Sequence, residues 1–261
     1  MRVIILCGGL GTRLREETEF KPKPMVEIGG KPILWHIMKQ YEHRGFRDFL
    51  LCVGYRGEVI RDYFINYQMR SRDIEVNTGT GEVKLLGETL PESAWTVKLQ
   101  DTGVHCLTGS RIKAALRYVE DDCFLATYGD GVSDVDIGAV IEHHKRSGKL
   151  ATVTAVRPSS RFGELSLEGD VVHSFNEKPQ TAEGWINGGF FVFEKRAFEQ
   201  ISADDPNISL EGGLLEHLAA RRQLSVYRHT GFWQCMDTYR ELCLLEDMWK
   251  SGQAPWKTWV S

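Results

Sequence analysis

Short apolar runs alternate along the first 156 residues with segments whose apolar positions recur at helical spacing. Such runs predict buried strands, and the helical spacing predicts amphipathic helices. We expect strands at residues 2–6, 49–53, 97–99, 123–127 and 151–156. We expect helices at residues 32–44, 58–64, 111–119 and 135–146. This order predicts an α/β fold with a mostly parallel central sheet that helices cover on both faces.

The pattern becomes richer in hairpins after residue 158. Apolar alternation around Glu168-Gly169-Asp170 predicts a hairpin of strands at 164–167 and 171–175. Further strands are expected at 185–193 and 224–227, and further helices at 195–201, 214–221 and 239–250. The polar segment 71–91, with Thr78-Gly79-Thr80-Gly81 as turn material, predicts a second hairpin or flap. Because no low-complexity linker separates the halves, we expect one domain over residues 1–261 with a small β-rich portion.

Composition narrows the class of partner. The chain has 261 residues, 42% of them hydrophobic, and a net charge of −4 without a basic run, which argues against nucleic acid as a partner. Its six cysteines are scattered and form no C-x-x-C pair, which argues against zinc. No apolar run approaches the ~18 residues of a membrane span, and the chain enters a strand without a signal peptide. We therefore expect a cytoplasmic protein without a membrane partner.

A glycine-rich turn with two cations follows the first strand. The turn reads Gly8-Gly9-Leu10-Gly11-Thr12-Arg13-Leu14, and Lys21-Pro22-Lys23-Pro24 comes after it. Backbone N–H groups of such a turn bind phosphate, and Arg13 and Lys23 are suited to hold a triphosphate. The turn lacks the Lys-Ser/Thr of a Walker loop. A dinucleotide fingerprint also fails, because Leu14 stands where its third glycine is required.

The segment from Gly8 to Pro24 resembles the signature of the sugar-1-phosphate nucleotidylyltransferases, with Glu16 where many members carry Pro. Segments 23–36, 127–131, 186–191 and 254–259 resemble the branch of that family that uses CTP and glucose 1-phosphate. The resemblance therefore runs along the whole chain. It implies a Rossmann-like nucleotidyltransferase fold, with residues 1–157 mainly for the nucleotide and 158–261 mainly for the sugar phosphate and the C-terminal portion.

The resemblance also implies an activity and the residues that carry it. A cytidylyl group would pass from CTP to α-D-glucose 1-phosphate with the help of Mg²⁺, giving CDP-glucose and pyrophosphate, in a homo-oligomer. Arg13 and Lys23 would be catalytic. The implied nucleotide-binding residues are Leu6, Gly8, Gly9, Leu10, Gly11, Thr12, Arg13, Lys23, Cys106, Arg111, Gly129 and Asp130. The implied sugar-phosphate-binding residues are Gly163, Glu177, Lys178, Asn187 and Gly188.

Two aspartates are candidate metal ligands. Asp130 follows an apolar strand, at the edge where open α/β sheets bind ligands, although an Asp-Gly pair is also an ordinary turn. Asp237 precedes the last predicted helix, where an aspartate is also a common N-cap. In the resembled family the two positions hold one Mg²⁺ together, which suits a hard cation bound by carboxylates and substrate phosphates.

The choice of base is assigned to Arg111 by the resemblance. An arginine donor would suit the acceptors O2 and N3 of cytosine, whereas uracil and thymine present a donor at N3. The glycine-rich turn does not distinguish nucleotides, so transfer from UTP or dTTP, or to another sugar phosphate, stays open. A catalytically silent regulatory module also stays open. The tryptophans Trp233, Trp256 and Trp259 are expected to serve packing or subunit contacts rather than ligand binding.

Overall fold

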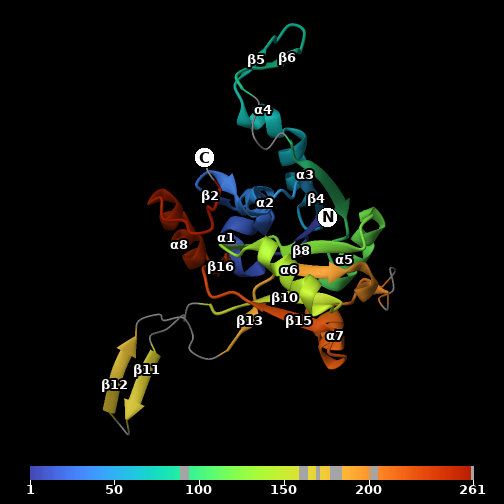
Figure 1. Cartoon of the computed structure of the whole chain (residues 1–261). Coiled ribbons are helices and arrows are strands. Elements are labelled where there is room, and N and C mark those ends of the chain that lie inside the picture. The colour runs from blue at the N-terminus through green and yellow to red at the C-terminus, as the bar shows by residue number, and fades with distance from the viewer. Residues whose placement is uncertain are drawn as a thin grey trace.

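The computed structural model describes residues 1–88, 94–158, 164–168, 171–176, 184–199, 201 and 205–259. Its centre is an eight-stranded sheet in the order β13-β10-β14-β8-β1-β4-β7, with β15 paired to β10 (Figure 1). The strands are β1 (Val3–Cys7), β4 (Asp48–Val53), β7 (Thr96–Asp101), β8 (Cys123–Tyr128), β10 (Ala151–Val156), β13 (Ile186–Asn187), β14 (Phe191–Glu194) and β15 (Leu224–Arg228). This arrangement confirms the predicted α/β class.

The first strand is apolar throughout because both of its faces are buried. Val3, Ile5 and Cys7 pack into one hydrophobic cluster, while Ile4 and Leu6 pack into a second one on the other face. The first cluster contains side chains of α2 (Ile33–His43), α3 (Gly57–Ile65), α6 (Ile137–Ser147) and α8 (Tyr239–Lys250). The second contains side chains of α5 (Thr108–Ala115), the π-helix η6 (Leu210–Leu215) and α7 (Glu216–Ala220). Helices therefore cover both faces, as the sequence predicts.

The sheet is parallel in the first half of the chain and mixed in the second. β1 pairs in parallel with β4 and β8, and β4 pairs in parallel with β7. β14 pairs antiparallel to β8 and so joins the second half to the first. The single strand predicted at 185–193 is wrong, because the chain forms β13 and β14 with a break between them. Gly189 (φ 81°) and Phe190 (φ 47°) adopt left-handed backbone there, which no continuous strand accommodates.

Three predicted helices also differ from the structure in extent or type. α5 begins at Thr108 instead of 111, and its last residues continue as the 3₁₀ turn η4 (Leu116–Tyr118). The segment predicted as a helix at 195–201 is the 3₁₀ turn η5 (Lys195–Phe198). The helix predicted at 214–221 begins earlier as η6, which contains a Gly-Gly pair, and ends as α7. Gly109 in α5 and the Gly-Gly pair in η6 hide these two helix starts from a propensity argument.

Short elements that carry no sequence pattern complete the fold. They are the 3₁₀ turns η1 (Thr12–Leu14) and η2 (Lys23–Met25), the helices α1 (Arg15–Thr18) and α4 (Tyr67–Ser71), and the strands β2 (Glu27–Ile28), β3 (Lys31–Pro32), β9 (Gly131–Ser133) and β16 (Trp233–Cys235). Both predicted hairpins form, as β5 (Ile74–Val76) with β6 (Val83–Leu85) and β11 (Glu164–Glu168) with β12 (Val171–Asn176). The β5–β6 hairpin projects beyond α4, away from the sheet (Figure 1). Among the described helices, none has the length and apolar character needed to cross a bilayer.

Aromatic side chains of the C-terminal segment enclose a histidine of α2. Trp256 is fully buried and Trp259 nearly so, which confirms their expected packing role. His36 is also fully buried, and its Nε2 contacts the Ile28 carbonyl oxygen at 2.9 Å. Since a carbonyl only accepts, Nε2 carries the proton, and Nδ1 is left to accept from Trp256 Nε1 at 3.4 Å. Protonation of Nδ1 would place two donors against each other.

We expect His36 to make the fold sensitive to acid. Burial lowers the pKa of His36 from its ordinary 6.5 to about 4, with only partial compensation from carbonyl groups around it. Between pH 6.5 and about 4, His36 is therefore protonated in the unfolded chain but neutral in the folded chain. The free energy of unfolding should fall by roughly 3 kcal/mol as the pH drops from 6.5 to 4, at ~1.4 kcal/mol per pKa unit.

Urea unfolding at several pH values measures this effect. His36→Gln should flatten the decline over that interval, whereas the exposed control His43→Gln should keep it. An equal decline in wild type and His36→Gln would contradict the assignment.

Candidate active site

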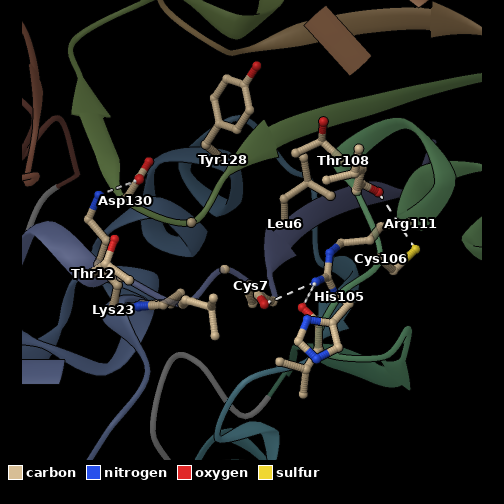
Figure 2. A pocket seen from close by; sticks show the side chains of 18 of the residues that line it. Leu6, Cys7, Thr12, Lys23, His105, Cys106, Thr108, Arg111, Tyr128 and Asp130 are labelled. Carbon is tan, nitrogen blue, oxygen red and sulfur yellow. Dashed lines mark hydrogen bonds and ion pairs between the residues drawn. The ribbon is translucent and has the colours of Figure 1, made fainter. Parts of the chain in front are cut away.

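A cavity of about 670 Å³ opens at the carboxyl ends of β1 and β8 (Figure 2). Its size lies within the ~300–1,000 Å³ typical of small-molecule sites. Every residue that the sequence assigns to the nucleotide lines this one cavity, and so does Asp237. Further lining residues, outside the set that the resemblance assigns to the nucleotide, are Cys7, Pro24, Val104, His105, Leu107, Thr108, Tyr128, Ser209 and Glu211.

The glycine-rich turn is held in shape by local hydrogen bonds. Gly11 adopts left-handed backbone (φ 63°), and the Leu14 amide donates to its carbonyl oxygen at 3.1 Å. The Thr18 hydroxyl contacts the Gly11 carbonyl oxygen at 3.0 Å and the Leu14 carbonyl oxygen at 2.8 Å. These contacts fix the turn between β1 and α1, so its backbone is ordered before any ligand binds.

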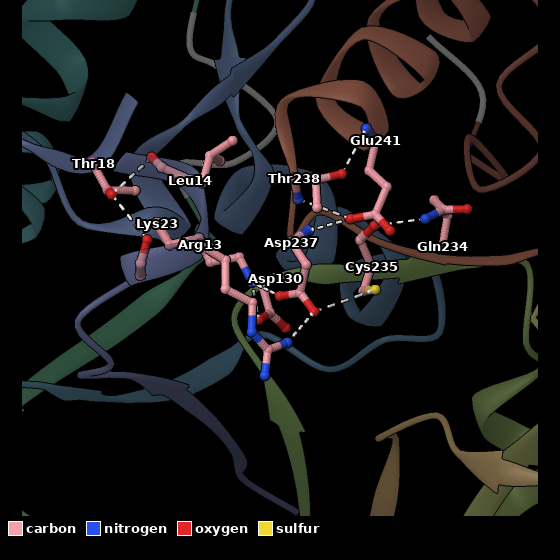
Figure 3. A network of polar contacts seen from close by, with 11 residues as sticks. Arg13, Leu14, Thr18, Lys23, Asp130, Gln234, Cys235, Asp237, Thr238 and Glu241 are labelled. Atoms are coloured by element: carbon pink, nitrogen blue, oxygen red, sulfur yellow. Dashed lines mark hydrogen bonds and ion pairs between the residues drawn. The ribbon is translucent and has the colours of Figure 1, made fainter. Parts of the chain in front are cut away.

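Lys23 lies between the two candidate metal ligands (Figure 3). Its Nζ donates to Asp130 Oδ2 at 2.7 Å and also to Asp237 Oδ1. Arg13, which is exposed, donates from Nη1 to Asp237 Oδ2 at 3.0 Å. The structure thus brings together four predicted residues that are up to 224 positions apart in the sequence.

Strand pairing and a helix cap place the two aspartates. Asp130 directly precedes β9, which pairs antiparallel with β16, and the Met236 amide donates to the Asp130 carbonyl oxygen at 2.9 Å. Asp237 follows β16 and is not the N-cap of α8. That position belongs to Thr238, which forms a capping box with Glu241. The carboxylate of Asp237 is therefore left to face Lys23 and Arg13.

The contacts of Lys23 and Asp237 shift the pKa of both groups. Burial by itself lowers the pKa of Lys23, but the charges of Asp130 and Asp237 and the hydrogen bonds to them outweigh it and raise this pKa above its ordinary value. Burial raises the pKa of Asp237, but Lys23 and Arg13 outweigh it and hold this pKa below its ordinary range. Lys23 and Asp237 consequently stay charged near neutral pH.

Arg111 ties the ends of three parallel strands together. Its guanidinium donates to the Gly8 carbonyl oxygen at 3.1 Å, the Val104 carbonyl oxygen at 3.1 Å, the Thr102 hydroxyl at 2.5 Å and the Val53 carbonyl oxygen at 3.4 Å. These contacts use four of its five N–H groups. Arg111 lines the cavity as predicted, but in this arrangement one N–H at most remains for a ligand.

A hydrogen-bonded chain that the sequence did not reveal borders the cavity. Tyr128 donates its hydroxyl to Glu211 Oε1 at 2.5 Å and accepts from Asn187 Nδ2 at 2.9 Å. Glu211 Oε2 accepts from the hydroxyls of Thr108 (2.9 Å) and Ser209 (2.8 Å). Burial and the neighbouring Glu211 raise the pKa of Tyr128, which keeps the phenol protonated. Ser209 is the N-cap of η6, and this capping pattern was the available sequence signal.

The predicted sugar-phosphate residues are only partly within the structure. Asn187 lies beside Tyr128, and Gly188 accepts a hydrogen bond on its carbonyl oxygen from Trp233 Nε1 at 2.8 Å. Gly163, Glu177 and Lys178 lie outside the described residues. Neither Asn187 nor Gly188 lines the cavity itself.

Comparisons with known proteins show what this chain is similar to. The profile of the nucleotidyl transferase family matches residues 2–238. Glucose-1-phosphate cytidylyltransferases of Salmonella typhi and Salmonella typhimurium are each 48% identical over 260 residues, which cover 99% of this chain and 100% of the relative. The crystal structure of HddC from Yersinia pseudotuberculosis complexed with GMP-PN has a TM-score of 0.68 at 24% identity and covers 95% of this chain and 99% of that one. The last likeness confirms the predicted Rossmann-like fold.

The contact between Arg111 and the glycine-rich turn predicts different effects for two neighbouring glycines. A Cβ at Gly8 would lie 2.0 Å from Arg111 Nη1, whereas a Cβ at Gly9 would meet no atom within 4 Å. Gly8→Ala should displace the guanidinium and destabilise the fold by roughly 1–3 kcal/mol, the usual cost of overpacking. Gly9→Ala is the matched control and should leave stability within about 0.5 kcal/mol of wild type. Chemical denaturation distinguishes the two variants. Equal stabilities would contradict the role of Arg111 in holding the glycine-rich turn.

Proposed function

The chain belongs to the nucleotidyl transferase family, and from this premise we propose that it transfers a cytidylyl group from CTP to α-D-glucose 1-phosphate. The products are CDP-glucose and pyrophosphate. The observation that carries the proposal is the full-length 48% identity to glucose-1-phosphate cytidylyltransferases. The single cavity that gathers the glycine-rich turn, Arg13, Lys23, Asp130 and Asp237 supports it.

The reaction needs two anions to approach each other. The phosphate of the sugar attacks the α-phosphorus of CTP in line, and the bond to the pyrophosphate leaving group breaks. Because a phosphate dianion is already a nucleophile, no general base is required, and the protein contributes orientation and charge. Arg13 and Lys23 would offset the charge on the triphosphate, and amides of the ordered turn would donate to its oxygens.

The aspartates suit the Mg²⁺ that the proposed reaction uses. A single ammonium group contacts carboxylate oxygens of both Asp130 and Asp237, so two hard donors converge on one cation-sized position. Mg²⁺ held there would neutralise phosphate charge and orient the triphosphate. The ammonium of Lys23 cannot share both carboxylates with a divalent cation, because like charges repel. We therefore expect Lys23 to turn to a phosphate oxygen when substrate binds.

Selectivity is assigned to two regions. We propose that Arg111 favours cytosine through the N–H that its protein contacts leave free, with Cys106 close to the base. We propose that Lys178 pairs with the sugar phosphate and that Glu177 accepts hydrogen bonds from sugar hydroxyls, together with Gly163, Asn187 and Gly188. Another nucleotide remains the alternative for the first region, since the fold also occurs in HddC complexed with GMP-PN.

The protein is proposed to act as a homo-oligomer. Ile74 and Val76 of β5 lie opposite Leu85 and Val83 of β6, so the four aliphatic side chains share one face of the projecting hairpin. Each of them is 36–48% exposed. A two-stranded hairpin is marginal alone, and an apolar face of this kind needs a cover. A second copy of the chain is the proposed cover.

All six cysteines are free, which suits the reducing cytoplasm in which we place the enzyme.

Pyrophosphate release tests the proposed reaction. The protein would be incubated with Mg²⁺ and glucose 1-phosphate, with CTP, UTP, dTTP, ATP and GTP in parallel. Release with CTP well above the others supports the proposal. A preference for another nucleotide overturns the role of Arg111 in base choice but keeps the chemistry. No release with any nucleotide would favour the silent module, which a Mg²⁺-dependent nucleotide titration would then identify.

Loss of a site charge should slow the reaction strongly. Arg13→Ala and Asp130→Ala should each lower kcat/KM by roughly 10²-fold or more, the range for removing a preorganised charged contact. Arg221→Ala, an exposed arginine at the end of α7, is the control and should retain wild-type activity. Steady-state kinetics with CTP as the varied substrate measures the loss. Full activity of either site variant would sink the assignment.

Disruption of the apolar hairpin face should reduce the assembly size. Val76→Asp places a charge within that face, and sedimentation velocity should then show a smaller species than wild type. Lys84→Ser changes the opposite face, where Lys84 pairs with Glu75, and should leave the assembly intact. An unchanged assembly in Val76→Asp would exclude this hairpin from the interface.

A further inference from the structure

Three side chains of types that bind metal ions meet where β8 begins, at the opposite end of this strand from the cavity. Cys123 is the first residue of β8, Glu194 is the last residue of β14, and the strand register sets the two directly opposite each other. His144, from the last turns of α6, lies over them. One ligand atom from each of the three side chains lies within 4.8 Å of the other two. From this geometry we propose that Cys123, His144 and Glu194 form a Zn²⁺ site.

The histidine is oriented as a metal ligand. His144 is almost fully buried, and its Nδ1 lies 2.9 Å from the hydroxyl of Thr152, a fully buried residue of β10. This contact leaves Nε2 to face Glu194. Metal-ligating histidines usually donate their second ring N–H to a fixed acceptor, which sets the tautomer and the ring plane. Thr152 supplies that acceptor here.

The separation of donor atoms agrees with tetrahedral coordination. Bonds of ~2.0–2.2 Å to nitrogen and oxygen place two tetrahedral ligands about 3.3–3.5 Å apart. His144 Nε2 and Glu194 Oε1 are 3.4 Å apart, which is long for a strong hydrogen bond and suits two ligands of one ion. The thiol of Cys123 lies within 4.8 Å of both donor atoms and would complete a three-ligand site, with the fourth position left to water.

The donor set favours zinc over magnesium. A thiolate and an imidazole bind borderline-soft cations, whereas the all-oxygen pair Asp130 and Asp237 suits Mg²⁺. The thiolate and the carboxylate together balance the two charges of Zn²⁺, and the thiol proton is released to solvent on binding. The ammonium of Lys195, the next residue after Glu194, donates to the Val119 carbonyl oxygen at 2.7 Å instead.

Two of the three proposed ligands, Cys123 and Glu194, are partly exposed to solvent. Glu194 is half-buried and lines a surface cavity of about 800 Å³ together with Asp122 and Lys195. The site lies at the start of β8, whereas Asp130 follows its end. A six-residue strand spans ~20 Å, so the ion would be remote from the reacting groups. It would join two strands to α6 and stabilise the fold rather than take part in phosphoryl chemistry.

Cobalt spectroscopy on the whole protein tests the site. Chelator-treated protein would be titrated with Co²⁺ in excess Mg²⁺, which competes with Co²⁺ for sites made of oxygen ligands alone. We expect one Co²⁺ per chain with a thiolate charge-transfer band, displacement of that ion by Zn²⁺, and a higher Tm in the presence of Zn²⁺. Cys123→Ser should abolish the band, whereas Cys243→Ser, a half-buried cysteine of α8, should keep it.

Two further variants separate a ligand role from a structural one. Thr152→Val leaves all three ligands in place and should weaken Co²⁺ binding by roughly 10-fold, the usual effect of losing an outer-shell partner. Glu194→Gln removes a charged ligand, so the affinity for Co²⁺ should fall while the thiolate band remains. This variant tests the site even if Cys123→Ser does not fold. Absence of the band in wild type, its survival in Cys123→Ser, or unchanged affinity in Glu194→Gln would overturn the proposal.

Discussion

The buried guanidinium of Arg111 is the contact on which the cavity depends. Three parallel strands end at this edge of the sheet, and their following turns expose carbonyl groups that need donors. One arginine donates at once to the turns after β1 and β7 and to the last residue of β4. Its planar fork makes these contacts in fixed directions, which a lysine could not do. The shape of the glycine-rich turn is therefore decided partly by Arg111, a helix residue 103 positions after Gly8.

The cluster of Lys23, Asp130 and Asp237 shows how the site tolerates concentrated charge without a ligand. Two carboxylates at close range repel each other, and burial adds a desolvation cost. The ammonium of Lys23 offsets both effects by contacting the two carboxylates together. The resulting arrangement keeps the aspartates near each other in advance, so that little reorganisation is needed when a cation and a triphosphate arrive.

Local patterns in the sequence predicted most strands and helices of the first half of the fold, and the family resemblance supplied residues that the structure brings to one cavity. β1, α2 and β8 fall within a residue or two of their predicted bounds because their apolar periodicity reflects burial on one or two faces. The chain formed by Tyr128 and Glu211 could not be predicted, since it joins residues 83 positions apart through tertiary contact. The cluster of Cys123, His144 and Glu194 could not be predicted for the same reason, because a search for local cysteine pairs cannot detect ligands from three separate elements. The break at Gly189 depends on left-handed backbone, which a strand-like composition conceals.

The aromatic cover over α2 has a consequence during protein synthesis. Trp256 and Trp259 pack beside His36, and more than 200 residues of chain separate them from it. The ribosome therefore makes the inner face of α2 long before it makes the side chains that shield that face. Contacts of such separation form late, and the apolar surface they will cover is open to aggregation until then. The side of α2 that carries His36 thus stays without this cover until Trp256 and Trp259 have been synthesised.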